Sequence, residues 1–331
     1  MSGLRVSGRL FRIEQVFDEE PDPRRVPLYR KFAADRVNIS FLYADVLEPA
    51  KRICCLVERE IVSRFGDVPV RNFKLPAHPQ GPEAALVSVF PHSFDPAAVG
   101  AALGAFGMED LAWHYMATSG SMVSFVIDYE RRENAVAALE NHIDFPEAHG
   151  PLCPGMEYDP IARSLKIAPE TVARYVEPKI RTYGINVQTG LKLFSLQMQA
   201  DAFEQWSRVA SERGFRFWFA SAFNTSDIDG IALEMLLKPP DIERGEADIE
   251  SLVVNDWAGS TEFREKAEMV SFHGPHFGDR YGIADKAIGS LKSAGVSVWL
   301  AGCVGATVTA VIPPDTSDKA VKALSEAFEI P

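Results

Sequence analysis

The sequence predicts an α+β fold of antiparallel sheets with helices on one face, and three observations lead to it. The chain has 331 residues, 47% of them hydrophobic and 24% charged, which is typical of a globular protein with more than one domain. Residues 268–331 carry the order strand, helix, strand, strand, helix. The same order can be traced three more times towards the N-terminus, which indicates an internal repeat.

The first strand and helix of the C-terminal copy are the easiest to justify. Residues 268–274, EMVSFHG, alternate between apolar and polar side chains as a half-buried strand does. From Ile283 to Ala294 the apolar residues recur at helical spacing, and Gly295 stands where a glycine commonly ends a helix. The sequence therefore predicts a strand, a glycine-rich loop and then a helix.

Two β-rich runs complete this copy, at 296–303 and 306–314, and Val304 with Gly305 predicts a short hairpin between them. The oxygens of residues 315–317, DTS, can cap the N-terminus of a last helix. The resulting order, β-α-β-β-α, is the split βαβ plan of ferredoxin-like units.

The other copies are less regular, and their expected boundaries follow from the proline-rich stretch between the second and the third. We expect a final helix at 244–255 in the third copy, a short first helix in the N-terminal copy, and one helix, at 169–175, between the pairs of units. The predicted domains are a unit at 1–80, a unit at 81–150, a linker at 151–188, a divergent unit at 189–256 and a unit at 257–331.

Charge and cysteine content restrict the partners. A formal net charge of -12 argues against nucleic acid or an anionic membrane as the main partner, because both attract clustered Lys and Arg. The four cysteines form no C-x-x-C pair, and no run of about 18 apolar residues is present. We therefore expect a cytoplasmic protein.

Residues 272–284, FHGPHFGDRYGIA, are the richest stretch in candidate site residues. Gly274, Gly278 and Gly282 are spaced by four, which matches neither of the glycine-rich phosphate motifs. Their backbone N–H groups precede a helix N-terminus, which suits a carboxylate, and Asp279 could receive an ammonium group. A metal site is the alternative, with His273, His276 and Asp279 as ligands. The Gly-Pro pair after His273 disfavours helical spacing of the two histidines, so we expect no metal and no cofactor.

Three short stretches of the C-terminal copy match a known family: DRYGIA at 279–284, SAGVSV at 293–298 and KAVKAL at 319–324. They resemble the ACT domains at the regulatory end of aspartate kinases, where Asp-x-Pro-Gly-Val-Ala leads into the first helix and Ala-Gly-Ile-Asn-Val follows it. Tyr281 replaces the usual proline, and residues 37–40, VNIS, echo the second stretch in the N-terminal copy. The resemblance implies tandem ferredoxin-like βαββαβ (ACT-like) units.

The Lys-Phe-Gly-Gly-Thr stretch of aspartate kinases is absent from the sequence. The resulting hypothesis is a regulatory protein that is not an enzyme and that binds a small molecule, with an amino acid as the ligand. We also expect a homodimer or an intramolecular pseudo-dimer, because open sheet edges of such units tend to pair. The expected ligand-binding residues are Gly274, Phe277, Gly278, Asp279, Tyr281, Gly282, Ile283, Val296 and Ser297.

Two alternatives remain at this point. One is a structural or protein-interaction module without a ligand. The other is an enzyme of an unrecognised class that uses His273, His276 and Asp279. Among the cysteines, Cys54 and Cys55 are expected to pack inside a strand, and Cys303, at a strand end, is the better reactive candidate.

Overall fold

The computed structural model describes residues 3–17, 26–45, 51–58, 83–146, 179–224, 230–238, 260–275, 277 and 280–331. The helices predicted at 169–175 and 244–255 lie outside these ranges. The strands are β1 (Gly3–Val6), β2 (Leu10–Phe17), β3 (Phe41–Asp45), β4 (Lys51–Glu58), β5 (Glu83–Phe90), β6 (Trp113–Thr118), β7 (Val123–Asp128), β8 (Ile185–Met198), β9 (Arg216–Asn224), β10 (Ile231–Lys238), β11 (Ser260–His273), β12 (Leu300–Val304) and β13 (Thr307–Ile312). The helices are α1 (Leu28–Ala34), α3 (Pro96–Met108), η1 (Tyr129–Arg131), α4 (Arg132–His142), α6 (Ala200–Glu212), α8 (Ile283–Ser293) and α9 (Ser317–Ala327).

The order strand, helix, strand, strand occurs four times, and we name these stretches unit 1 (residues 3–58), unit 2 (83–142), unit 3 (185–238) and unit 4 (260–327). One backbone hydrogen bond recurs at the end of the first helix of each unit, where an N–H group donates to the carbonyl five residues before it. The four donors are Val37, Leu111, Phe215 and Val296. These bonds give matching positions in the four units.

The thirteen strands of the described residues form one antiparallel sheet that closes on itself, because β5 pairs with β7 as well as with β1 and β2. The sheet has two layers. Units 1 and 4 form the layer β2-β4-β3-β12-β13-β11, and units 2 and 3 form the layer β5-β7-β6-β9-β10-β8. Strand β3 pairs with β12 and β6 pairs with β9, so the units join edge to edge within the chain.

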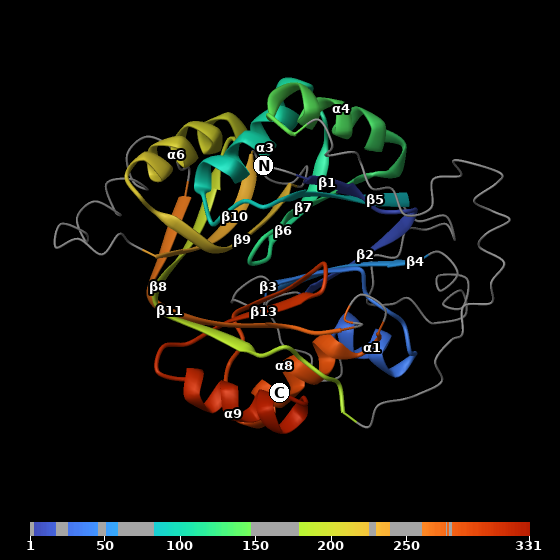
Figure 1. Ribbon diagram of the computed structural model, residues 1–331, viewed down its shortest axis with the longest axis vertical. Helices are drawn as coiled ribbons and strands as arrows, with labels where there is room; N and C mark the ends of the chain where they lie inside the picture. The colour runs from blue at the N-terminus through green and yellow to red at the C-terminus, as the bar shows by residue number, and fades with distance from the viewer. Residues whose placement is uncertain are drawn as a thin grey trace, which may run out of the picture.

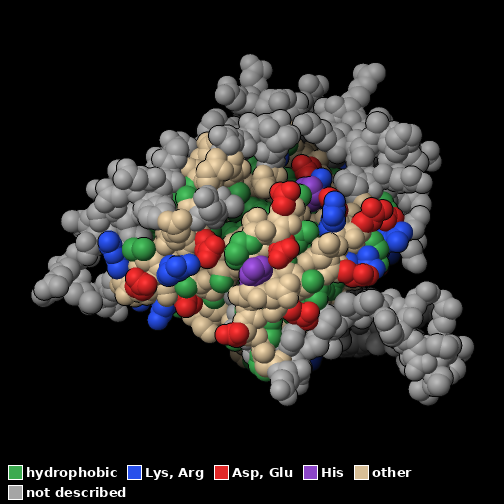
Figure 2. Space-filling model, turned by 90° about the horizontal axis from the view of Figure 1, so that it is seen from above, with side chains coloured by type: hydrophobic (Ala, Val, Ile, Leu, Met, Phe, Trp, Pro, Cys, Tyr) green, Lys and Arg blue, Asp and Glu red, His purple; other side chains and the backbone are tan. Residues whose placement is uncertain are grey.

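Helices cover the outer faces of both layers (Figure 1). Helices α3, α4 and α6 lie over units 2 and 3, while α1, α8 and α9 lie over units 1 and 4. The prediction of an α+β fold with antiparallel strands is confirmed. Figure 2 shows the side with α3, α4 and α6, where basic, acidic and apolar side chains are interspersed over the described residues. No described helix is long and apolar enough to cross a membrane.

The core has a part under each helix layer and two parts between the strand layers. Adjacent residues of one strand serve different parts: Cys54 packs between the layers and Cys55 under the helices, both free and buried. In β9, a register shift at Trp218 sends Phe217 and Phe219 to opposite faces. Each such buried aromatic side chain contributes about 1.5–3 kcal/mol, so both faces of the sheet stabilise the fold.

Helix α8 follows the predicted pattern, since Ile283, Ala287 and Leu291 are buried against the sheet. Gly295 has a φ of +69°, the left-handed conformation expected of a glycine after a helix. Strand β12 begins only at Leu300, later than the 296 predicted, and the N–H of Val296 still donates to the carbonyl of Leu291 in α8. Strand β8 begins at Ile185, so the last four residues of the predicted linker, 151–188, are in a strand.

The N-terminus of α9 differs from the prediction. Its N-cap residue, Thr316, makes no capping bond with its side chain. The carboxylate of Glu268 on β11 accepts the N–H groups of Thr316 and Ser317 instead, at 3.1 and 2.8 Å. The residue that caps the helix is therefore distant in sequence and comes from the neighbouring sheet.

Candidate ligand pocket between units 1 and 4

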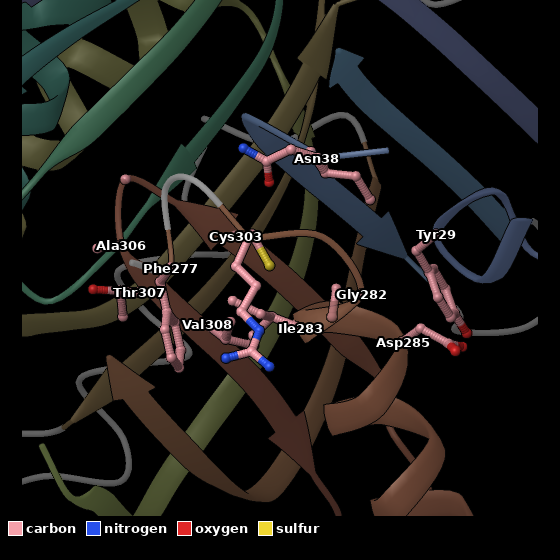
Figure 3. A pocket seen from close by; sticks show the side chains of 14 residues that line it. Tyr29, Asn38, Phe277, Gly282, Ile283, Asp285, Cys303, Ala306, Thr307 and Val308 are labelled. Carbon is pink, nitrogen blue, oxygen red and sulfur yellow. The ribbon is translucent and has the colours of Figure 1, made fainter. Parts of the chain in front are cut away.

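A pocket lies where the strand-to-helix connection of unit 4 meets unit 1 (Figure 3). Helix α1 and the residues before β3 form one side, and the start of α8 with the β12–β13 hairpin forms the other. Its lining residues are Tyr29, Asn38, Ile39, Phe277, Arg280, Gly282, Ile283, Ala284, Asp285, Cys303, Gly305, Ala306, Thr307 and Val308.

The N-terminus of α8 is one electropositive part of the pocket, and Arg280, which also lines it, is the other among the described residues. Gly282 has a φ of +81° and caps the helix without a side-chain hydrogen bond. The N–H groups of a first helical turn lack partners within the helix and carry a partial positive charge, so they attract anions. Asp285, in this first turn, pairs with Arg30 of α1 at 3.2 Å. The two units are thus joined by an ion pair at the pocket.

Two titratable side chains that line the pocket, Tyr29 and Cys303, are neutral at neutral pH. Burial raises the pKa of Tyr29 to about 12 and that of the Cys303 thiol to about 12. A thiol that stays protonated is a poor nucleophile, so the structure argues against Cys303 as a reactive residue. Both side chains can still form hydrogen bonds with a ligand.

Phe277 closes the pocket from the side of the loop. Its side chain is 6% exposed, and its ring packs edge-on against Phe272 with centroids 5.7 Å apart. The cavity volume is about 20 Å³, and a cavity of about 10–15 Å³ by this measure holds one water molecule. An amino acid needs more space, so its binding requires the lining residues to move apart.

Some of the predicted site residues meet in this pocket and others do not. Phe277, Gly282 and Ile283 line it. Gly274 lies beside it, packed so closely against the carbonyl oxygen of Arg181 that a Cβ would collide there. Tyr281 is 44% exposed. The remaining predicted loop residues, Gly278 and Asp279, lie outside the described residues, as does His276.

The pocket does not include Val296 and Ser297, although they were predicted to face the loop. Val296 is buried in the core under α8 and Ser297 is exposed. Their place is taken by Asn38 and Ile39, which follow the recurring helix-ending bond in unit 1 as Ser297 and Val298 do in unit 4. The similarity of residues 37–40 to the second family stretch is the feature of the sequence that could have pointed to these two residues.

Of the three candidate metal ligands only His273 is described, since His276 and Asp279 lie outside the described residues. His273 ends β11, and its ring packs against Tyr183 with centroids 5.4 Å apart. Within the ranges that the structure describes, no three His, Cys, Asp or Glu side chains lie close enough together to hold a metal ion.

The strand-to-helix connections of units 2 and 3 lie wholly within the described residues. In unit 2 the connection at 91–95 places the ring of Phe94 against Trp218 of unit 3, with centroids 4.7 Å apart. In unit 3 only Gln199 separates β8 from α6. In unit 1 the connection includes residues outside the described ranges. The connection of unit 4 also includes residues outside those ranges.

No protein-family model and no curated protein matches the sequence. Among solved structures, an aspartate kinase from Synechocystis aligns with 99% of this chain and 55% of its own, at 15% identity and a TM-score of 0.69. The regulatory subunit of aspartate kinase from Thermus thermophilus, in a ligand-free form, aligns with 45% of this chain and 99% of its own, at 16% identity and a TM-score of 0.38.

The first of these likenesses establishes the fold, and this chain spans about half the length of that kinase (55%). It overturns the prediction that the chain is not an enzyme, because the structure that aligns with 99% of the chain is that of an enzyme. It also leaves the expected absence of a kinase domain without support.

Proposed function

We propose that this chain regulates an aspartate-kinase type of activity by binding an amino acid between units 1 and 4. In this proposal the four units are tandem ACT-like βαββαβ units. The observation that carries it is the pocket at the N-terminus of α8, which combines residues of two units and lies at the loop with the family resemblance. The aspartate kinase fold, shared over 99% of the chain, supports the same assignment.

The chemistry of the pocket suits a zwitterion. A ligand carboxylate would accept N–H groups from the first turn of α8, where the helix dipole favours negative charge. The Asp285 carboxylate, 27% exposed, would receive the ammonium group. Asn38 and Tyr29 offer neutral polar groups on the opposite wall (Figure 3).

A regulatory effect would follow from the position of the pocket. Because the cavity of about 20 Å³ is smaller than an amino acid, the ligand binds only after units 1 and 4 or the loop around Phe277 have moved apart. Such a ligand stabilises the opened arrangement by its difference in affinity for the two states. The packing of the two units is therefore the quantity that the ligand would control.

The test is a thermal-shift screen of the full chain with the twenty amino acids, followed by calorimetric titration. We expect at least one amino acid to raise Tm. Asp285→Asn is expected to weaken its affinity about tenfold, as loss of one charged contact does. Asp318→Asn is the matched control, because Asp318 occupies the first turn of α9, outside the pocket. If no amino acid raises Tm, the proposal is wrong.

A further inference from the structure

The contact between the residues before α3 and unit 3, which we call the joint between units 2 and 3, corresponds in position to the pocket between units 1 and 4. Two residues of the chain, Phe94 and Asp95, lie at this joint. Phe94 and Asp95 come directly before α3, as Tyr281 and Gly282 come before α8. Phe217, two residues after the recurring bond of unit 3, corresponds to Ile39, two residues after that of unit 1. The two joints can therefore be compared position by position.

At the joint of units 2 and 3, Asp95 satisfies the helix N-terminus. Its carboxylate accepts the N–H of Ala97 at 3.0 Å, so the first turn of α3 already has an anion. Gly282, at the same position before α8, has no side chain to do this. Asp95 thus supplies to α3 the carboxylate that a bound ligand would supply to α8.

Phe94, the residue before Asp95, contacts unit 3 with its ring and with its backbone. Its ring packs against Trp218 of unit 3, and its carbonyl oxygen accepts the N–H of Phe217 at 2.9 Å. His92 holds the connection from behind, since its Nδ1 accepts the N–H of Phe94 at 3.0 Å. Tyr281, the residue that corresponds to Phe94 in unit 4, is 44% exposed instead.

We infer that Phe94 and Asp95 act as a built-in ligand, which keeps units 2 and 3 in one packing and leaves the joint of units 1 and 4 as the one that responds to a free amino acid. Asp95 stands for the carboxylate of that ligand and Phe94 for its apolar part. The inference rests on the proposed function for the identity of the free ligand. It predicts one binding event per chain and a second, latent site.

The experiment removes the built-in ligand with the double variant Phe94→Ala, Asp95→Gly in the full chain. The twenty amino acids are screened by thermal shift, and any that binds is titrated by calorimetry. We expect one ligand per chain for the unmodified protein and two for the double variant. Phe223→Ala is the matched control: it removes a ring that is also partly buried, between the strand layers, and should still bind one.

Each outcome decides one question. A double variant that binds one ligand, or an unmodified chain that binds two, overturns the inference and leaves the proposed function intact. An unmodified chain that binds no amino acid contradicts the proposed function. In that case, binding of an amino acid by the double variant still supports the inference. If neither protein binds an amino acid, the inference is overturned as well.

If the double variant does not fold, Phe94→Leu replaces it, because leucine keeps an apolar side chain but removes the ring from Trp218. Amide exchange at residues 216–219 is then expected to rise at least tenfold over the unmodified chain. An unchanged exchange rate overturns the inference.

Discussion

Two tyrosines between the strand layers differ in one hydrogen bond. Tyr43 and Tyr115 are each 1% exposed, and their ring centroids are 5.3 Å apart. The hydroxyl of Tyr115 accepts Nη1 of Arg52 at 3.4 Å, whereas the Tyr43 hydroxyl has no partner among the described residues. A buried hydroxyl without a partner retains its desolvation cost and gains nothing in return.

Tyr43→Phe is therefore expected to leave the free energy of unfolding unchanged or to raise it by up to about 1 kcal/mol, and Tyr115→Phe to lower it by about 1 kcal/mol. Urea denaturation of both variants measures the difference. A Tyr43→Phe variant that loses as much stability as Tyr115→Phe would show that its hydroxyl has a partner.

His92 makes stability depend on pH. Its Nε2 donates to the carbonyl of Ser119 at 2.7 Å while Nδ1 accepts from Phe94, an arrangement that only the neutral ring allows. Burial lowers the pKa of His92 below its usual 6.5, and the nearby Asp95 carboxylate opposes this in part. The folded-state pKa is thus below the unfolded one, so this stabilisation is present above about 6.5 and is lost as pH falls.

We expect the free energy of unfolding to decrease from pH 7 to pH 5, and the decrease to be smaller in His92→Gln. Urea denaturation at the two pH values measures both. Equal decreases in the two proteins would assign the pH dependence to other groups.

At the scale of elements, the cap of α9 gives a sharp prediction. The Glu268 carboxylate, 7% exposed as a residue, accepts two N–H groups of this helix. Glu268→Gln keeps the shape but removes the charge, and is expected to lower the free energy of unfolding by about 1–2 kcal/mol. Glu326→Gln, on the exposed side of the same helix, should change it by less than about 0.5 kcal/mol. Similar losses in both variants would contradict the capping role.

The elements themselves were largely predictable, because their signals are local. The helical spacing from Ile283 and the glycine at 295 predicted α8, alternation predicted the end of β11 from residue 268, and a β-rich run predicted β13. The cap from Glu268 was not predictable, since the acceptor is separated from Thr316 by 48 residues and only the folded sheet brings them together. Local pattern carries no information about such pairs.

At the scale of the whole molecule, the order of pairing within the two layers is nested: in one layer unit 1 pairs with unit 4, and in the other unit 2 pairs with unit 3. Each layer therefore takes one unit from each half of the chain, and every strand from β2 to β13 pairs on both sides. Neither half can complete a layer alone.

Separate expression of residues 1–146 and 179–331 tests this arrangement. We expect the two halves to be insoluble or aggregated alone, because each exposes unpaired strand edges, and to form a one-to-one complex when they are produced together. Analytical ultracentrifugation measures the mass. Two halves that are each stable and monomeric would contradict the nested pairing.

Nesting also explains which part of the candidate site the sequence could predict. The loop around Phe277 and Gly282 was found from its glycines and its position before a helix. The opposite wall, with Asn38 and Ile39, comes from the far end of the chain. Because the four units have similar patterns, several pairings of units are compatible with the sequence, and the pattern does not distinguish among them.

The nested order also determines which strand pairs can form first during synthesis. The N-terminal end of the chain leaves the ribosome first. Units 2 and 3 can therefore pair while the edge of β3 in unit 1 still lacks its partner strand. That edge meets β12 only after the last unit has emerged. Until then it is an exposed strand of buried-type residues, and the nascent protein is most prone to aggregation in this interval.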